Sequence, residues 1–325
     1  MSNRSEETAE EMAQTVQRGD VGFVGLGNVG RHMAGNLVAS GWHLLVHDAE
    51  PGRAAAFAAE QGCVAVDHAR ELAPAGTIVT MLPNGDVVRE VILDSGLADE
   101  LAPGSLVLDT SSSDPVGTRD LGDELARRHV VLVDAGVSMP EGGRASERMI
   151  TFMVGADDDE AFARAREFLD AMGSEVFRLG PRGAGHAMKT LNNYIGASGK
   201  AAALDALVVG TKLGLDPAMM LEVLNVSTGR NFNTEFPLRD RAVKGRFDSG
   251  YALALLIKDL RIAGRFAERS GFESPLSGVL QRAYVDAFEG LGGGNVDHLA
   301  ALRHWEQRAG VQVAAVSAEQ PADAS

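Results

Sequence analysis

The sequence is poor in cysteine and in positive charge. Its one cysteine, Cys63, cannot form an internal disulfide and suits a reducing compartment, so we expect a cytoplasmic protein in which Cys63 is a small buried apolar residue. Lysine and arginine number 30 against 45 acidic residues, and the net charge is −15. Such a balance argues against nucleic acid or an anionic membrane as a partner.

Long apolar runs are also missing. No run approaches the length needed to span a bilayer, and residues 1–19 lack the basic and apolar regions of a secretory signal. We therefore expect no membrane partner and a polar, flexible tail over 1–19. An apolar fraction of 45% is ordinary for a globular protein, and 325 residues are enough for two domains.

The most informative stretch that is present covers residues 21–48. The apolar run Val21–Val24 predicts a buried strand, and a G-x-G-x-x-G turn, a helical pattern and a second apolar run ending at Asp48 follow it. This order is the fingerprint of a dinucleotide-binding domain, in which turn and helix start hold the pyrophosphate. The turn residues expected to contact the cofactor are Gly25, Leu26, Gly27, Asn28, Val29 and Gly30.

Asp48 also bears on which cofactor binds. A carboxylate at the tip of the second strand can accept both ribose hydroxyls, and it repels the 2′-phosphate of NADP. Ala49 offers no guanidinium for that phosphate, whereas Arg53 lies close enough in sequence to provide one. The pattern favours NAD, with NADP as the alternative.

Apolar runs alternate with helical patterns up to about residue 180, which predicts an α/β fold of the Rossmann type with a doubly wound, mostly parallel sheet. The further strands are expected at 78–82, 106–109, 130–133, 151–154 and 175–179, with helices at 52–60, 87–92, 114–128 and 158–171. Ligands of such sheets lie beyond the carboxyl ends of the strands. That rule gathers the glycine turn, Leu82, Pro83, the serines 111–113 with Ser112 among them, and the loop after Asp134 around one crevice.

Beyond residue 182 the strand patterns largely vanish. Helices are expected at 186–213, 216–224, 251–269, 276–289 and 296–309. The predicted organisation is a nucleotide-binding domain over 20–182, a helical substrate and dimerisation domain over 183–310, and a flexible tail over 311–325. A small helical domain cannot bury all its apolar faces alone, so we expect a homodimer or homotetramer.

The start of the long helix carries the residues best suited to chemistry. Lys189 shares a helix face with Asn192 and Asn193, three and four residues later. A lysine at a domain seam can protonate a carbonyl oxygen as hydride arrives, or take the proton back during oxidation, and burial would lower its pKa toward neutrality. The alternative is a solvated lysine on a surface helix. No metal site is expected.

Six ordered motifs over residues 20–310 make the chain similar to the β-hydroxyacid dehydrogenases, the family of 3-hydroxyisobutyrate dehydrogenase, tartronate semialdehyde reductase and the glyoxylate/succinic semialdehyde reductases. The motifs are GLGNVGRHMAGNL at 25–37, MLP at 81–83, the serine-rich turn ending at Pro115, DAGVS at 134–138, GAGHAMKTLNN at 183–193 and KDL at 258–260. The family fold, a nucleotide-binding domain followed by a helical one, agrees with the pattern above.

The resemblance implies roles for individual residues. Lys189 matches the catalytic lysine, Asn193 the amide that helps to hold the substrate, and Ser138 the serine that binds the substrate carboxylate. Ser112 stands where many members have a cofactor-contacting threonine, and Lys258 matches a lysine near the nicotinamide. Leu82 and Pro83 would pack along the dinucleotide.

The chain departs from the family pattern at two places. The usual Pro-Val-Ser-Gly-Gly is here Gly-Val-Ser-Met-Pro over 136–140, with Gly142-Gly143 displaced, and Pro140 removes an N–H donor from the carboxylate-binding loop. Asn192 replaces the histidine of the 6-phosphogluconate branch, so a decarboxylating sugar-phosphate enzyme is not expected. Among the cations that could meet an acidic substrate, Arg230 interests us most, since its glycine- and asparagine-rich loop resembles a pocket wall.

We therefore expect an NAD(P)-dependent oxidoreductase (EC 1.1.1 type) that interconverts a small 3-hydroxy acid and its semialdehyde or keto acid, with Lys189 as general acid and base. One alternative is an imine reductase, which shares the architecture but usually lacks this lysine. The other is a catalytically silent nucleotide-binding interaction module, which would be expected to have lost it.

Overall fold

The computed structural model describes residues 19–139 and 149–315. The chain divides into two compact units, residues 1–189 and 190–325, which we call unit 1 and unit 2. The predicted boundary, 182/183, lies a little before this division. The start of the long helix α8 (Ala184–Lys212) belongs with unit 1 because strand residues of that unit hold it, as described below.

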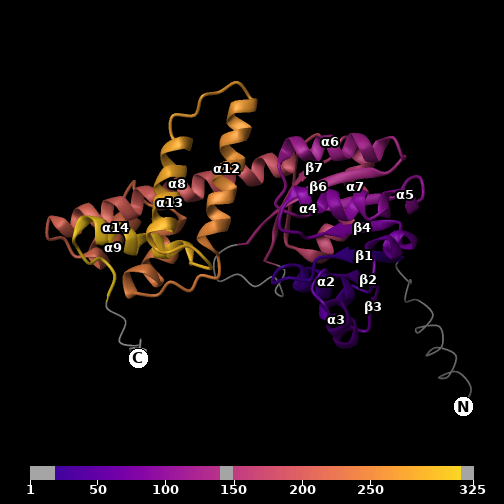
Figure 1. Ribbon diagram of the computed structural model, residues 1–325, viewed down its shortest axis with the longest axis horizontal. Coiled ribbons are helices and arrows are strands. Elements are labelled where there is room, and N and C mark those ends of the chain that lie inside the picture. The colour runs from indigo at the N-terminus through magenta and orange to yellow at the C-terminus, as the bar shows by residue number, and fades with distance from the viewer. Residues whose placement is uncertain (1–18, 140–148, 316–325) are drawn as a thin grey trace, which may run out of the picture. The chain divides into compact units, whose positions relative to one another are not determined.

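Unit 1 is built on an eight-stranded sheet, and the expected Rossmann-like, mostly parallel architecture is confirmed (Figure 1). The strand order is β3-β2-β1-β4-β5-β6-β7-β8, and only the β6–β7 pair is antiparallel. The strands are β1 (Asp20–Val24), β2 (His43–His47), β3 (Val64–Ala65), β4 (Thr77–Thr80), β5 (Leu106–Asp109), β6 (Val131–Ser138), β7 (Thr151–Gly155) and β8 (Glu175–Gly180).

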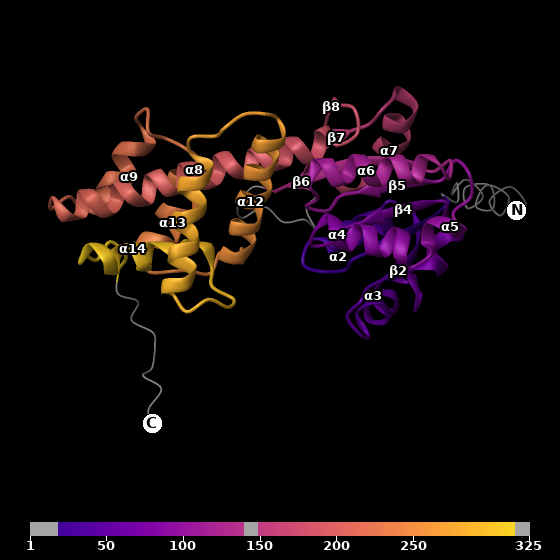
Figure 2. The same ribbon diagram turned by 45° about the horizontal axis from the view of Figure 1, so that its top comes forward.

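Helices cover both faces of this sheet, which makes it doubly wound (Figure 2). One face packs against α2 (Gly30–Ala39), α3 (Arg53–Gln61) and α7 (Asp159–Met172). The other packs against η1 (Ala69–Ala75), α4 (Gly85–Arg89), the π-helical turn η2 (Glu90–Asp94), α5 (Leu97–Glu100) and α6 (Pro115–Ala126). Successive residues of β5 alternate between the two cores: Leu106 and Leu108 enter the first, and Val107 enters the second.

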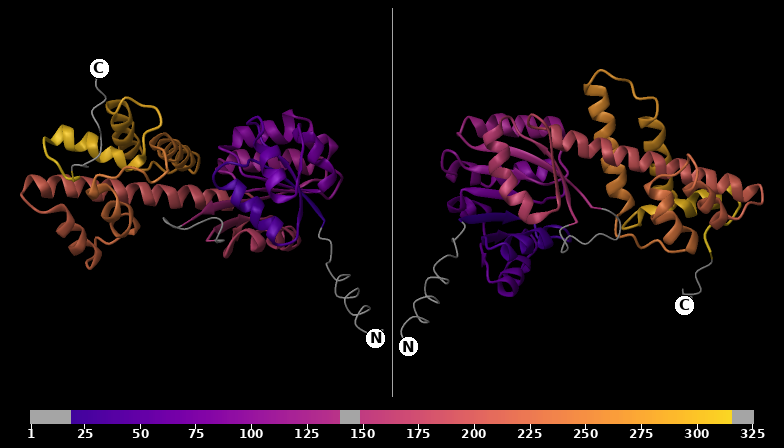
Figure 3. Two further views of the ribbon diagram at one scale, coloured as in Figure 1. Left: turned by 90° about the horizontal axis from the view of Figure 1, so that it is seen from below. Right: turned by 180° about the vertical axis from the view of Figure 1, so that it is seen from behind.

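Unit 2 is helical, as expected. After α8, which Figure 3 shows as one continuous helix, come α9 (Pro217–Asn225), α10 (Phe232–Glu235), α11 (Pro237–Asp240), η4 (Ala242–Lys244), α12 (Leu253–Arg269), α13 (Ser277–Gly290), η5 (His298–Ala300) and α14 (Ala301–Ala309). Within the described part of this unit, β-structure is limited to a single bridge between Ala252 and Asp297. Two clusters of buried side chains, one around Leu204 and Leu207 and one around Leu256 and Tyr284, form its core.

Residues 311–315, which the sequence assigned to a flexible tail, pack against unit 2. Val313 and Ala314 are buried in the core of unit 2, and both of their backbone N–H groups donate to Glu306 Oε1 at 2.6 Å. The Ala315 N–H donates to the Val243 carbonyl. Small apolar residues in an alanine-rich segment gave no helical or strand periodicity, so the sequence offered no sign of this packing. Residues 316–325 and 1–18 lie outside the described part.

Over the described ranges, no helix is both long and apolar enough to cross a membrane.

Candidate functional site

The glycine turn after β1 shows which of its glycines serve the fold. Gly25 has φ +97°, and a Cβ added there would lie 2.3 Å from the Met81 carbonyl oxygen. A Cβ on Gly30 would lie 1.9 Å from the Gly25 oxygen. A Cβ on Gly27 would meet no atom within 4 Å. The protein's own packing explains the first two glycines, whereas Gly27 leaves a cradle of the kind that a bound pyrophosphate fills.

The helix that follows begins without a side-chain cap. Val29 occupies the N-cap position of α2 and makes no capping hydrogen bond, and the first turn holds no acidic residue. The exposed Gly27 and Asn28 immediately precede it. The positive end of the helix dipole therefore lies beside the cradle, where it suits a phosphate.

Asp48 is located at the end of β2, as the fingerprint predicts, and its carboxylate also braces the turn. Oδ2 accepts from the Leu26 N–H at 2.7 Å, and Oδ1 accepts from the Glu50 N–H at 2.8 Å and from Arg53 at 3.0 Å. In the sequence, Arg53 is the cation closest to a 2′-phosphate bound at Asp48. In this structure its guanidinium is paired with Asp48.

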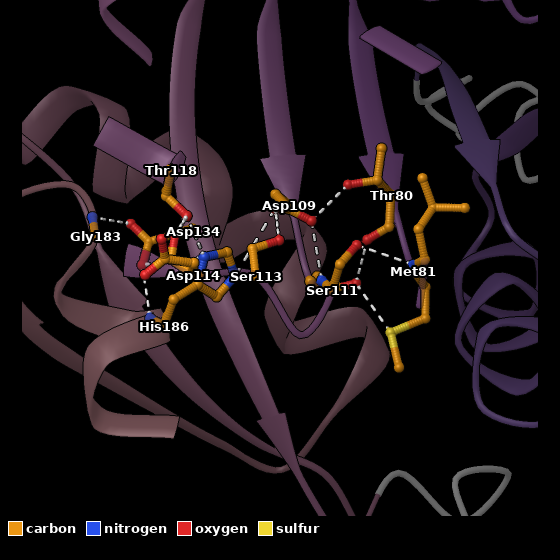
Figure 4. Close-up of polar contacts among 12 residues, drawn as sticks. Thr80, Met81, Asp109, Ser111, Ser113, Asp114, Thr118, Asp134, Gly183 and His186 are labelled. Carbon is orange, nitrogen blue, oxygen red and sulfur yellow. Dashed lines mark hydrogen bonds and ion pairs between the residues drawn. The ribbon is translucent and has the colours of Figure 1, made fainter. Parts of the chain in front are cut away.

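A buried hydrogen-bond network organises the carboxyl ends of β4 and β5 (Figure 4). Asp109 accepts from the Thr80 hydroxyl at 2.8 Å, the Ser111 N–H at 3.0 Å and the Ser113 hydroxyl at 2.9 Å. Ser111 Oγ in turn accepts from the Leu82 N–H at 2.9 Å. The two loops predicted to line the cofactor site are thus joined to each other and to one buried carboxylate.

The predicted cofactor contacts in these loops lie at the surface of this network. Leu82 and Ser112 are half-buried and Pro83 is exposed, whereas Ser111 and Ser113 on either side of Ser112 are buried. The two flanking serines therefore fix the turn, and Ser112 is the most accessible of the three serines.

A second buried carboxylate, Asp134, holds the beginning of α8. Asp134 is fully buried on β6, and its two oxygens accept from the Gly183 N–H at 2.6 Å and the His186 N–H at 2.8 Å. Burial raises the pKa of Asp134, while the nearby His186 and the two N–H donors oppose the shift. Asp134 therefore anchors the N-terminal turn of the helix that carries Lys189.

His186 fills the space between the two buried carboxylates. Its ring is buried, its Nδ1 lies 2.8 Å from the Thr118 hydroxyl, and its nitrogens lie 3.9 Å from Asp109 Oδ2 and Asp134 Oδ2 (Figure 4). His186 Nε2 has no hydrogen-bond partner among the described residues. Asp109 and Asp134 are paired neighbours in the register of β5 and β6.

Lys189 is half-buried and lies directly against β6. A Cβ added to Gly136 would lie 2.6 Å from Lys189 Cβ and 3.3 Å from its Cγ, so the lysine stem occupies the space that a side chain at 136 would need. Ser138, two residues further along the strand, points to the same face. Unit 1 therefore places Lys189 and Ser138 on one side of the end of β6.

The remaining residues of the lysine motif belong to unit 2. Asn192 is exposed, whereas Asn193 Nδ2 donates to Asp259 Oδ2 at 2.7 Å. The Tyr251 hydroxyl donates to the same oxygen at 2.7 Å, and burial followed by the charge of Asp259 raises the pKa of Tyr251. Lys258 Nζ lies 3.2 Å from Asp259 Oδ1. Asn193 and Lys258 thus share one acidic partner within this unit.

Arg230 is exposed, and its Nε lies 2.7 Å from Glu235 Oε1. The Asn231 side chain caps the short helix α10 that follows. The altered loop that includes Pro140, Gly142-Gly143 and Arg144 lies outside the described residues. Within the described ranges, no group of three or more histidine, cysteine, aspartate or glutamate side chains could hold a metal ion.

Comparison with known proteins identifies the family to which both units belong. Residues 20–180 match the model of the NAD-binding domain of 6-phosphogluconate dehydrogenase, and residues 183–305 match that of the NAD-binding domain of NADP-dependent 3-hydroxyisobutyrate dehydrogenase. The 2-(hydroxymethyl)glutarate dehydrogenase of Eubacterium barkeri is 32% identical over 90% of this chain and 97% of its own length. The chain belongs to the 3-hydroxyisobutyrate dehydrogenase family.

Two further members support this assignment. The 3-hydroxyisobutyrate dehydrogenase of Pseudomonas aeruginosa is 34% identical over 82% of this chain and 91% of its own. The Mycobacterium tuberculosis 3-hydroxyisobutyrate dehydrogenase, solved with L-serine, matches with a TM-score of 0.78 at 30% identity, covering 88% of this chain and 98% of that one. The chain is thus an NAD(P)-dependent dehydrogenase of the β-hydroxyacid type, acting on CH–OH groups, and the glycine turn and Asp48 suit such a cofactor.

Several residues that organise the site were given no role from the sequence: Thr80, Asp109, Thr118, Asp134, Tyr251 and Asp259. A signal existed for two of them. Asp109 and Asp134 each follow apolar residues in a predicted buried strand, where a carboxylate is costly unless it is hydrogen-bonded. The partners of the others come from distant segments, so only the fold reveals them.

Proposed function

We propose that the chain oxidises a small primary 3-hydroxy acid to its semialdehyde, or catalyses the reverse reduction, with Lys189 as the general acid and base. The position of Lys189 carries this proposal, because its half-buried stem lies against the end of β6 on the face of Ser138. A bound nicotinamide would supply the hydride exchange at carbon. Lys189 would take the hydroxyl proton during oxidation and return it to the carbonyl oxygen during reduction.

The substrate class is supported by the relatives. The names 2-(hydroxymethyl)glutarate and 3-hydroxyisobutyrate, and the L-serine with which the mycobacterial protein was solved, all denote a CH₂–OH group on the carbon next to a carboxylate. Ser138 would hold that carboxylate, and Asn193 would orient the substrate through the amide oxygen that does not face Asp259. Asn192 and Arg230 are further candidates for binding the acid.

We propose NAD as the preferred cofactor. Asp48 presents a carboxylate at the end of β2, and this charge would meet the 2′-phosphate of NADP. Arg53, the cation nearest to it in sequence, is already paired with the same carboxylate. Ser112, Leu82, Pro83 and Lys258 would contact the cofactor.

We also propose a homo-oligomer, either a dimer or a tetramer. Unit 2 exposes large apolar side chains at the end of α8 and along α9: Leu213 (77% exposed), Met219 (60%), Val223 (54%) and Val226 (88%). Apolar surface of this extent is typical of a contact between subunits.

The decisive experiment is the Lys189→Ala variant. Turnover of 3-hydroxyisobutyrate, L-serine and 2-(hydroxymethyl)glutarate should fall by about a thousandfold or more, because general acid–base catalysis and substrate positioning are both lost. Cofactor affinity, measured by NADH and NADPH fluorescence, should stay within about twofold. Lys212→Ala, which removes an exposed lysine from the same helix, is the matched control and should behave as wild type.

Other outcomes distinguish the alternatives. Equal turnover in Lys189→Ala and wild type would remove this lysine from the mechanism. Cofactor binding without turnover of any hydroxy acid by the wild type would favour the silent module. Reduction of cyclic imines, but not of semialdehydes, would favour an imine reductase.

A further inference from the structure

The link between the two buried carboxylates and Lys189 lies wholly within unit 1. Asp134 bonds two N–H groups of the turn that begins α8, and Lys189 follows His186, one of those two donors, by one turn. An α-helix is stiff over so short a distance, so fixing its first turn fixes where the stem of Lys189 lies.

The contacts around Asp134 leave its side chain and the start of α8 little room to move. A Cβ on Gly155 would lie 2.4 Å from Asp134 Oδ1, and one on Gly185 would lie 2.8 Å from Oδ2 and 2.1 Å from the Met153 oxygen. Two glycines therefore let the helix start and β7 approach the carboxylate closely. Neither a longer side chain at 134 nor a displaced helix would fit without moving backbone.

Gly136 completes this arrangement on the lysine side. The backbone of β6 approaches the stem of Lys189 so closely that an added methyl group would lie 2.6 Å from its Cβ and 3.1 Å from the Gly185 oxygen. The lysine stem fills the space that a side chain at 136 would need. Asp134 and Gly136 thus fix α8 from two neighbouring points of one strand.

Resting on the proposed role of Lys189, we propose that Asp134 is a positioning residue: it binds the first-turn N–H groups of α8 and, together with Gly136, sets the position of the Lys189 ammonium. His186 and Asp109 join this anchor to the loops of the cofactor site. The imidazole fills the gap between the two carboxylates, and Asp109 holds Ser111 and Ser113. The bonds of Ser111 and Ser113 in the loop bearing Ser112 go to Asp109 and not to Asp134, so a change at Asp134 leaves them in place.

The test is Asp134→Asn, which keeps the shape and one acceptor but turns an N–H₂ group toward one of the two backbone donors. We expect kcat to fall by about ten- to a hundredfold, because small displacements of a catalytic group have effects of this size. The Kd for NADH, measured by fluorescence, and the KM for cofactor should stay within about twofold of wild type. A loosened domain would instead weaken cofactor binding together with kcat.

The control is Asp158→Ala. Asp158 is also a helix-starting carboxylate of unit 1 and accepts from the Ala161 N–H at 2.7 Å, but it caps α7, which does not carry Lys189. This variant should melt at a lower temperature than wild type and keep wild-type kcat. Gly136→Ala provides a second probe. It replaces no group that bonds to Asp134 and crowds the Lys189 stem and the Gly185 oxygen, so it should also lower kcat without changing cofactor affinity.

Wild-type kcat in Asp134→Asn, or a parallel loss of cofactor affinity, would overturn the proposal, as would the same loss of kcat in Asp158→Ala. If Asp134→Asn yields no folded protein, Gly136→Ala decides, and wild-type kcat there overturns the proposal. Lys189→Ala separates the two ideas. An inactive Lys189→Ala beside a fully active Asp134→Asn refutes only the positioning role, whereas an active Lys189→Ala refutes the proposed mechanism.

Discussion

Three glycines within six residues have different physical roles. Gly25 and Gly30 are required because any side chain would collide with a carbonyl oxygen of the protein, at 2.3 and 1.9 Å. Gly27 faces open space, so its backbone is free to be approached by a ligand such as a pyrophosphate. Within one motif, Gly25 and Gly30 therefore serve the stability of the fold, and Gly27 serves binding.

Gly27→Ala should therefore leave the melting temperature unchanged and weaken NADH binding by about tenfold or more, since a methyl group would stand where the pyrophosphate must approach. Gly30→Ala is the companion variant and should destabilise the protein through its clash with Gly25. Thermal melts and NADH fluorescence titrations measure both effects. Unchanged affinity in Gly27→Ala would mean that the cofactor does not approach this part of the turn.

Asp48→Asn tests the choice of cofactor. The amide oxygen can still accept from the Leu26 N–H, while the loss of charge releases Arg53 from its ion pair and removes the repulsion of a 2′-phosphate. The ratio of NADPH to NADH affinity should rise by about tenfold. A ratio equal to that of wild type would show that other residues determine the preference.

At the level of elements, unit 2 contains a buried pair that responds to pH. Lys200 Nζ lies 2.5 Å from His298 Nδ1, linking α8 to η5, and both side chains are buried. Burial, with the Lys200 charge, holds the pKa of His298 well below its usual 6.5. Between the lowered value and 6.5 the unfolded chain binds a proton that the folded chain does not, so stability falls as the pH falls below about 6.5.

His298→Gln should reduce this dependence. The wild type should lose up to about 1.4 kcal/mol of unfolding free energy per pH unit below about 6.5 from this group alone, and the variant should lack that contribution. Urea unfolding at about pH 7.5, 6.5 and 5.5 measures the slope. The exposed His68 provides a control, because His68→Gln should keep the wild-type slope. Identical slopes in wild type and His298→Gln would contradict the assignment.

Elements with strong local signals could be predicted from the sequence, and contacts between distant segments could not. The strands of unit 1 appear as apolar runs, and Asp114-Pro115 and Asp216-Pro217 correctly marked the starts of α6 and α9. The short α10 and α11 have too few residues to show a period. Lys189 was identifiable from its motif, whereas its anchor Asp134 was not, since that role depends on N–H groups about fifty residues away in the chain.

For the whole molecule, the expected oligomer can be measured directly. Light scattering coupled to gel filtration should give a mass of two or four times 34.2 kDa. Replacing both Val223 and Val226 by glutamate should lower that mass, because burying two carboxylates in an apolar contact is costly. Val64→Glu, at an exposed valine of unit 1, should leave it unchanged. A wild-type mass of 34.2 kDa would refute the oligomer.

The paired positions of Asp109 and Asp134 on β5 and β6 also have a consequence for how the chain reaches its native state. Sliding one strand past its neighbour by a single residue would turn every side chain of the shifted strand to the opposite face of the sheet. A purely aliphatic pair of strands would tolerate that slip. Here the slip would bury the two carboxylates among leucines and valines, away from the N–H and hydroxyl groups that donate to them. The two acids therefore favour the native register of β5 and β6, and the position of Lys189 depends on that register.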